Sequence, residues 1–222
     1  MRFDDREDAG RQLARALEGH RGPETVVVGL TRGGVPVAAV VAERLDAPLD
    51  ALVVRKLGAP IQPELGIGAI AEGGGRWVDR RIQAATGTSD AELDAVEARE
   101  RALMERRVAR YRAVRPRVKL RDRTVLLVDD GIATGGTVRA AIQSIRAEGP
   151  RKLVLAVPVA AVPTLEALAG QVDETVCVEP RYDLMAIGVW YRDFSQVDDE
   201  RVIELLSGHR RSEREEGAVV PT

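Results

Sequence analysis

The chain has 222 residues, enough for one substantial α/β domain, and its 35 acidic residues slightly outnumber its 33 lysines and arginines. A net charge of −2 gives no general attraction to nucleic acid or an anionic membrane, and no apolar run reaches membrane-spanning length. From the first residues we expect no signal peptide. The single cysteine, Cys177, excludes an intramolecular disulfide and is expected in the core, so we expect a cytoplasmic protein.

Short apolar runs alternate with helical patterns along most of the chain. The patterns predict helices over 5–18, 35–45, 89–113, 138–147, 163–168 and 197–206. Apolar runs predict strands over 25–30, 49–55, 125–128, 153–157, 175–178 and 186–190, and a hairpin joining 69–71 to 77–78. Glycines and prolines predict a loop over 57–68, and the polar residues 207–222 predict a disordered tail.

This alternation of strands and helices predicts an α/β fold, with a doubly wound, mostly parallel sheet in a single domain over residues 1–206. The long helix at 89–113 is an insertion into that core, and residues 186–196 are a candidate for a small C-terminal hood. Ligands bind at the carboxyl ends of the strands in such sheets. Three loops, 31–34, 56–68 and 131–137, follow strands at that edge, so we expect them to meet at one site.

The most informative stretch is 125–137, which reads Val-Leu-Leu-Val-Asp-Asp-Gly-Ile-Ala-Thr-Gly-Gly-Thr. A buried strand ends in Asp129 and Asp130, and a loop rich in Gly and Thr then leads into a helix. Free backbone N–H groups, the helix dipole and threonine hydroxyls would converge on one anion. Carboxylates accept hydrogen bonds from hydroxyls, so the pattern favours a ligand that carries both phosphate and hydroxyls. No lysine follows the glycines, which excludes a Walker A loop.

This stretch closely resembles the phosphoribosyl-pyrophosphate (PRPP) signature of the type I phosphoribosyltransferases, and the resemblance covers roughly residues 25–194. It implies that Asp129 and Asp130 hold the ribose 2′- and 3′-hydroxyls. It also implies that the 5′-phosphate is bound by the loop residues Gly131, Ile132, Ala133, Thr134, Gly135, Gly136 and Thr137. The implied cofactor is Mg²⁺ carried by PRPP, so contact between the metal and the two acids would be indirect.

Two basic segments resemble the pyrophosphate site of the same family. Thr31, Arg32 and Gly33 follow the first strand, and Arg32 adds a fixed charge suited to phosphate. Lys56 ends the second strand, where the family approaches the pyrophosphate. The loop 57–68 corresponds to the family's mobile loop, whose closure would exclude water from the reaction. The structural alternatives are a tight turn with a solvated Arg32 for the first segment and surface bases at a strand end for the second.

The remaining candidates have structural alternatives. Trp190 and Asp193 belong to an aromatic cluster that resembles the family's base-binding hood, but the cluster could instead be a strand end packed on the core. The helix at 89–113 runs into the basic residues 115–119, and its interleaved glutamates favour a solvated face. The alternatives for this helix are a subunit contact, as in a homodimer, or an RNA-binding face. We expect no nucleic-acid partner.

The resemblance implies a pentosyltransferase of nucleotide salvage, which transfers the 5-phosphoribosyl group of PRPP to a nitrogenous base and releases pyrophosphate. Asp129, Asp130, Arg32 and Lys56 would supply positioning and charge stabilisation, and Mg²⁺ would neutralise the leaving group. Ala133 stands where 6-oxopurine enzymes carry an acid, so hypoxanthine and guanine are not the expected bases and the acceptor stays open. The missing acid also leaves an alternative open, a PRPP-binding regulatory protein without turnover.

Overall fold

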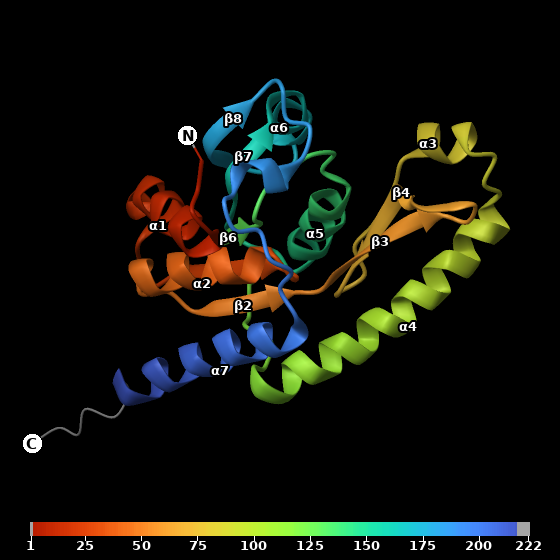
Figure 1. The fold of residues 1–222 in the computed structure, drawn as a ribbon. Helices are drawn as coiled ribbons and strands as arrows, with labels where there is room; N and C mark the ends of the chain where they lie inside the picture. Colours follow the sequence, from red (N-terminus) through yellow and green to blue (C-terminus); the bar gives the residue numbers. More distant parts are fainter. Residues whose placement is uncertain (1, 217–222) are drawn as a thin grey trace, which may run out of the picture.

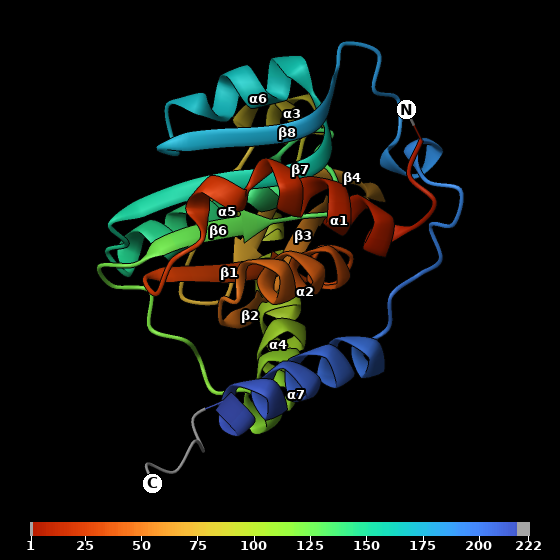
Figure 2. The same cartoon turned by 90° about the vertical axis from the view of Figure 1, so that its left-hand side faces the viewer.

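Five parallel strands form the central sheet of the computed structural model, which describes residues 2–216, with side chains up to His209. Every neighbouring pair of strands in this sheet runs parallel, which confirms the predicted doubly wound, mostly parallel α/β architecture. In spatial order the strands are β2 (Leu49–Leu52), β1 (Thr25–Leu30), β6 (Thr124–Val128), β7 (Lys152–Ala161) and β8 (Glu174–Arg181) (Figures 1 and 2). Within residues 2–216, no helix combines the length and apolarity needed to cross a membrane.

Helices cover both faces of this sheet. One face is covered by α1 (Arg6–Ala16) and α2 (Gly34–Leu45), and the other by α5 (Gly136–Ala147) and α6 (Val162–Ala169) (Figure 1). Side chains alternate along each strand, so that Val27 contacts the α1–α2 layer and its neighbour Val28 contacts the α5 layer. Because both faces are buried, the central strands β1, β6 and β7 are apolar after their first residues, as the sequence pattern predicts.

A second, antiparallel sheet projects from the main body, and we call it, together with its two helices, the arm (Figure 1). The arm consists of β3 (Val54–Ala59), β4 (Gln62–Ala71), β5 (Arg76–Val78), α3 (Arg80–Ala85) and α4 (Asp90–Val114). The predicted hairpin is present, because Ala69 pairs with Trp77. The predicted long helix is also present, and it begins with a capping box between Ser89 and Glu92. Helix α4 returns the chain from the tip of the arm to the main body.

The predictions for residues 49–68 are wrong in two respects. The second predicted strand is two strands in different sheets, since β2 ends at Leu52 and β3 begins at Val54. The predicted loop 57–68 is a β-hairpin formed by β3 and β4. Gly58 lies at a shift in its register, where a Cβ would lie 2.1 Å from the Pro63 carbonyl oxygen. The glycines and prolines that suggested a loop instead allow a close approach in an irregular hairpin.

Two predictions near the C-terminus also differ from the structure. Residues 186–190, predicted as a strand, contain a short 3₁₀ helix, η2 (Ile187–Trp190), whose backbone turns back toward the N-terminal segment. Helix α7 (Asp199–Glu216) begins close to the predicted helix 197–206 but continues through residues 207–216, where the sequence predicts a disordered tail. Residues 217–222 of that predicted tail lie outside the described residues.

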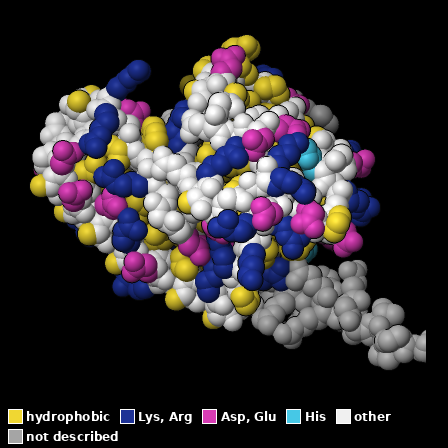
Figure 3. Space-filling view, turned by 180° about the vertical axis from the view of Figure 1, so that it is seen from behind, with side chains coloured by type: hydrophobic (Ala, Val, Ile, Leu, Met, Phe, Trp, Pro, Cys, Tyr) yellow, Lys and Arg dark blue, Asp and Glu magenta, His cyan; other side chains and the backbone are white. Residues whose placement is uncertain are grey.

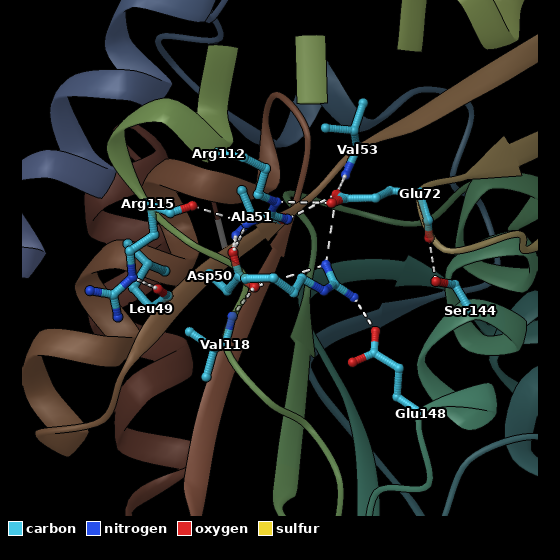
Figure 4. A network of polar contacts seen from close by, with 11 residues as sticks. Leu49, Asp50, Ala51, Val53, Glu72, Arg112, Arg115, Val118, Ser144 and Glu148 are labelled. Carbon is cyan, nitrogen blue, oxygen red and sulfur yellow. Dashed lines mark hydrogen bonds and ion pairs between the residues drawn. The ribbon is translucent and has the colours of Figure 1, made fainter. Parts of the chain in front are cut away.

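A buried polar network joins the arm to the central sheet (Figure 4). Asp50 on β2 is fully buried, and its carboxylate accepts a 2.6 Å hydrogen bond from Arg112 near the end of α4. The same guanidinium donates to Glu72 just after β4 and to the carbonyl oxygen of Ala51. Arg117 lies 3.8 Å from Asp50 and 3.7 Å from Glu72. The basic end of α4 therefore belongs to the interior and fixes the arm at its root.

Candidate functional site

Two glycine-containing loops meet at the carboxyl ends of the adjacent strands β1 and β6. A Cβ on Gly33 would lie 2.0 Å from Oδ2 of Asp130, and a Cβ on Gly34 would lie 2.7 Å from the carbonyl oxygen of Val128 and 3.0 Å from Oδ1 of Asp129. No side chain would fit at either glycine without displacing the acids or the strand. The structure thus brings together the predicted 31–34 loop and the acid pair. The Thr31–Arg32 peptide bond in this loop is cis.

The loop after the acids forms an open cradle at the start of α5. Gly135 adopts a left-handed conformation with φ of 76°, which directs the chain into the helix. The first i to i−4 hydrogen bond of α5 runs from Arg139 N–H to the Gly135 carbonyl. The N–H groups that precede Arg139 in the first turn have no carbonyl of the helix to bind, so they can donate to a ligand. Thr164 on α6 donates a hydrogen bond to the Ala133 carbonyl and so holds the loop against that helix. The geometry matches the anion cradle that the sequence predicts.

Side chains from two neighbouring elements border the cradle. The ring of Trp77 on β5 approaches Gly136 so closely that a Cβ there would lie 2.9 Å from it. On another side, the side chain of Ile187 in η2 lies 2.6 Å from the position of a Cβ on Gly131. The hood segment therefore packs directly on the cradle, and the arm reaches it through Trp77.

Burial makes ionisation of the two acids unfavourable, and the positive charges of Arg6 and Lys56 offset part of that cost. Burial, together with the neighbouring charge of Asp130, raises the pKa of Asp129 well above its ordinary value. Burial also raises the pKa of Asp130, although the charge of Arg6 and a hydrogen bond from it act in the opposite direction. Arg6 Nε donates to Asp130 Oδ2 at 2.9 Å. Perturbed carboxylates in a cleft of this kind are typical of functional sites.

Two cations of the predicted site are not committed to a partner within the part of the chain that the structure describes. Among the described residues, neither the side chain of Arg32 nor that of Lys56 forms a hydrogen bond or an ion pair, although the charge of Arg32 helps to lower the pKa of Asp199. Lys56 is close enough to interact electrostatically with both Asp129 and Asp130. Most other basic side chains near the site are paired, as Arg55 is with Glu100 at 2.5 Å. Uncommitted cations at the mouth of a cleft are suited to an anionic ligand.

Two hollows each have one predicted site residue in their lining, Lys56 in the first and Asp193 in the second. One, of about 320 Å³, separates the β3–β4 hairpin from α4 and is lined by Lys56, Gly58, Pro63 and Arg99 among others. The other, of about 300 Å³, lies beside Arg6 and is lined by Asp193, Ser195 and Arg201 among others. Both open close to the predicted site residues.

The structure places the two predicted hood residues in different settings. Trp190 is half-buried, with the Arg181 guanidinium 4.3 Å from its ring centroid, and its indole Nε1 is buried without a hydrogen-bond partner in the described part of the chain. Asp193 is exposed and accepts a 2.9 Å hydrogen bond from Ser195 N–H. The sequence places Tyr191 in the aromatic cluster of the candidate hood without marking it as a site residue, and it gives no sign of Arg6 and Trp77, which contact an acid and the cradle. No local pattern marks them, because each reaches the site from a distant part of the chain.

The donor set is compatible with magnesium only when a ligand supplies further oxygens. Within residues 2–209, no three His, Cys, Asp or Glu side chains cluster in a way that could hold a metal. Mg²⁺ is commonly bound through one or two carboxylates plus substrate phosphates. Two acids alone fit Mg²⁺ only as part of such a set, so Asp129 and Asp130 would meet the metal indirectly, through the bound ligand. Cys177 belongs to no such site, and burial raises the pKa of its thiol to about 11.

Comparison with known proteins agrees with this geometry. The sequence model of the family described as "Phosphoribosyl transferase domain" matches residues 3–179. Two proteins of Mycobacterium tuberculosis, from strains H37Rv and CDC 1551 and both named "Putative phosphoribosyl transferase", are 48% identical over 217 residues. The match covers 98% of this chain and 49% of theirs, so the chain spans about half the length of these curated relatives.

A solved structure is similar over almost its whole length. The crystal structure of TT1426 from Thermus thermophilus has a TM-score of 0.78 and 42% sequence identity, over 94% of this chain and 99% of the other. The family match covers most of the chain, and the parallel sheet, the acid pair and the glycine cradle stand where the signature predicts them. The chain therefore belongs to the type I phosphoribosyltransferase family.

Proposed function

We propose that the protein transfers the 5-phosphoribosyl group of PRPP to a nitrogen atom of a heterocyclic base and releases pyrophosphate. The observation that carries this proposal is the arrangement at one sheet edge. A backbone cradle lies beside the half-buried Asp129 and the buried Asp130, and the cations Arg32 and Lys56, whose side chains have no partner among the described residues, belong to neighbouring loops. This arrangement suits a ligand with a phosphate at one end, hydroxyls in the middle and a pyrophosphate at the other end.

Each group of residues has one role in this proposal. The 5′-phosphate binds the cradle formed by residues 131–137, where helix N–H groups provide donors. Asp129 and Asp130 accept hydrogen bonds from the ribose hydroxyls. The loop at Thr31–Gly33 and the ammonium group of Lys56 bind the pyrophosphate. Mg²⁺, bound with PRPP, would supply charge neutralisation of the departing pyrophosphate.

The reaction needs no protein nucleophile. The bond between ribose C1′ and the pyrophosphate oxygen breaks, and its electron pair leaves with pyrophosphate. A bond then joins C1′ to the acceptor nitrogen, which loses its proton. The protein contributes position and charge, since Arg32 and Lys56 face the leaving group and the acids hold the sugar. The β3–β4 hairpin, which carries Lys56, is placed to restrict the access of water to C1′.

The acceptor site is proposed beside the hood. Trp190 and Asp193 lie in the segment that packs against the cradle through Ile187. Ala133 supplies no acid at the position where 6-oxopurine enzymes carry one. The proposal therefore favours bases that need no help from a carboxylate at that position.

Calorimetry with Mg-PRPP, followed by pyrophosphate release assays with a panel of purine and pyrimidine bases, tests the proposal. We expect saturable binding of PRPP that Asp130→Asn weakens and Asp94→Asn, an exposed acid on α4, leaves unchanged. We also expect turnover with at least one base. No binding at millimolar PRPP would overturn the proposal. Binding without turnover for any base would favour the alternative, a PRPP-binding regulatory protein.

A further inference from the structure

Arg6 reaches the acid pair from the first turn of α1, far from the signature in sequence. Its Nε donates to Asp130 Oδ2 at 2.9 Å, and each of the two side chains is only 12% exposed. The same guanidinium donates to the Ser195 carbonyl at 2.8 Å and lies 4.0 Å from the ring centroid of Phe194. Held from three directions, this guanidinium is a fixed charge and not a mobile surface arginine.

The backbone of Asp130 is held as well. The hydroxyl of Tyr191 donates to the Asp130 carbonyl at 2.6 Å, and the ring of Tyr191 packs between Phe3 and Phe194 with centroid distances of 5.3 and 4.9 Å. Chain segments from both ends of the domain therefore support one residue of the signature. Such support from outside the signature is what a precisely oriented functional side chain requires.

The titratable groups around Asp130 come from four parts of the fold. Asp129 follows β6 with Asp130 itself, Arg6 comes from α1, Lys56 comes from β3, and Tyr191 follows η2. Burial favours the protonated form of Asp130 and so raises its pKa, whereas Arg6 and Lys56 favour the carboxylate. Of the two cations, only Arg6 forms a hydrogen bond with Asp130. Lys56 lies on the arm and, under the proposed function, faces the pyrophosphate.

We propose that Arg6 is a positioning residue for phosphoribosyl transfer, which holds Asp130 as an oriented carboxylate and leaves its second oxygen to accept a ribose hydroxyl. This inference rests on the proposed function. It adds an arginine outside the signature to the residues that determine how PRPP binds. Arg6 does not touch the reacting atoms and acts through Asp130.

The test compares Arg6→Met and Arg6→Lys with a control, Arg11→Met, which removes an exposed arginine from the same helix. For each folded variant, PRPP affinity is measured as a function of pH. We expect Arg6→Met to weaken binding about tenfold or more at neutral pH, because a charge-assisted hydrogen bond is lost. The lost affinity should return partly as the pH rises and Asp130 ionises. Arg6→Lys should keep part of the effect, and Arg11→Met should match the wild type.

A second measurement does not depend on PRPP. Carboxyl ¹³C NMR, assigned with Asp130→Asn, should show a higher pKa for Asp130 in Arg6→Met than in the wild type. An unchanged pKa, or an unchanged pH profile of PRPP affinity in a folded Arg6→Met variant, would overturn the inference and leave the proposed function standing. Failure of the wild type to bind PRPP would instead overturn the proposed function, and the NMR titration would still decide whether Arg6 holds Asp130 as an anion.

Discussion

The carboxylate of Asp130 occupies the space that a side chain at Gly33 would need. A Cβ at Gly33 would lie 2.0 Å from Oδ2 and 2.7 Å from Cγ of Asp130. The two residues come from loops almost a hundred residues apart in the sequence, and each sets the position of the other. The proposed pyrophosphate loop and the proposed ribose site are therefore one packed unit.

Gly33→Ala should disrupt the site more than the fold. The added methyl group must push Asp130 away from Arg6, so we expect PRPP affinity to fall by about tenfold or more. Gly22→Ala is the matched control, because nothing lies within 4 Å of a Cβ at Gly22. Calorimetry and circular dichroism on both variants provide the measurement. Wild-type affinity in Gly33→Ala would show that the loop moves freely with respect to the acid.

Asp129→Asn should stabilise the protein at neutral pH and abolish PRPP binding. Burial raises the pKa of Asp129, so the folded state holds its proton more tightly than the unfolded chain does. Stability is therefore lost as the pH rises from the ordinary value of 3.8 through the higher folded pKa, at about 1.4 kcal/mol for each pKa unit. An amide at this position avoids that loss.

The stability of Asp129→Asn is checked by thermal unfolding between pH 3 and pH 8. Its advantage over the wild type should grow with pH above 3.8 and vanish below it, where the carboxyl group is protonated in both states. Asp94→Asn, on the exposed face of α4, should show no such dependence. A lower melting temperature for Asp129→Asn at pH 7 would contradict the prediction.

Arg112→Met should destabilise the fold by about 3 kcal/mol, because it leaves the fully buried Asp50 and the largely buried Glu72 without their main partner. Urea unfolding measures the change. Arg201→Met is the comparison, because Arg201 is 41% exposed and pairs with the exposed Glu204, so its loss should cost less than about 1 kcal/mol. Equal losses for the two variants would show that the network at the root of the arm contributes little.

Pyrophosphate release should be slow with hypoxanthine and guanine. Ala133 offers no carboxylate to take a proton from the purine, and general base catalysis is commonly worth about a hundredfold or more. Steady-state rates with these bases, compared with the best acceptor in the panel, give the answer. Fast turnover with either one would mean that another residue supplies the base or that none is needed.

RNA binding should be weak at physiological salt. Arg107 and Arg110 on α4 form ion pairs with Asp199 on α7, so their charges are partly neutralised within the protein. Acidic and basic side chains are also interspersed on the face shown in Figure 3. Filter binding measures the affinity. Submicromolar binding that falls steeply with salt, and that is lost when Arg106, Arg107 and Arg110 are replaced by Gln, would refute this expectation.

The sequence predicts the parts of the molecule that depend on local pattern and misses those that depend on distant contacts. The apolar strand before Asp129 and the capping box at Ser89 are both present where the pattern places them. The hairpin at residues 57–68 was missed, because glycine and proline in a twisted, irregular hairpin look the same as in a loop.

The basic end of α4 shows the same limit. Its arginines read as a solvated face, but Arg112 is inside the molecule because Asp50 and Glu72, from two different strands, meet there. The partners of Arg6 are equally distant in the sequence. The helical pattern around Arg6 gives no information about a contact with Asp130, which lies more than a hundred residues away in the sequence.

The backbone pairing of Phe3 with the segment after η2 has a consequence for biosynthesis. Phe3 N–H donates to the Trp190 carbonyl, and Arg192 N–H donates to the Phe3 carbonyl, so the backbone of Phe3 is held by residues that are synthesised much later than Phe3 itself. Until those residues leave the ribosome, Asp130 lacks both its tyrosine and the aromatic ring that supports Arg6. The nascent chain can form its parallel sheet before these residues emerge, but the arrangement around its acid pair must wait for Tyr191 and Phe194.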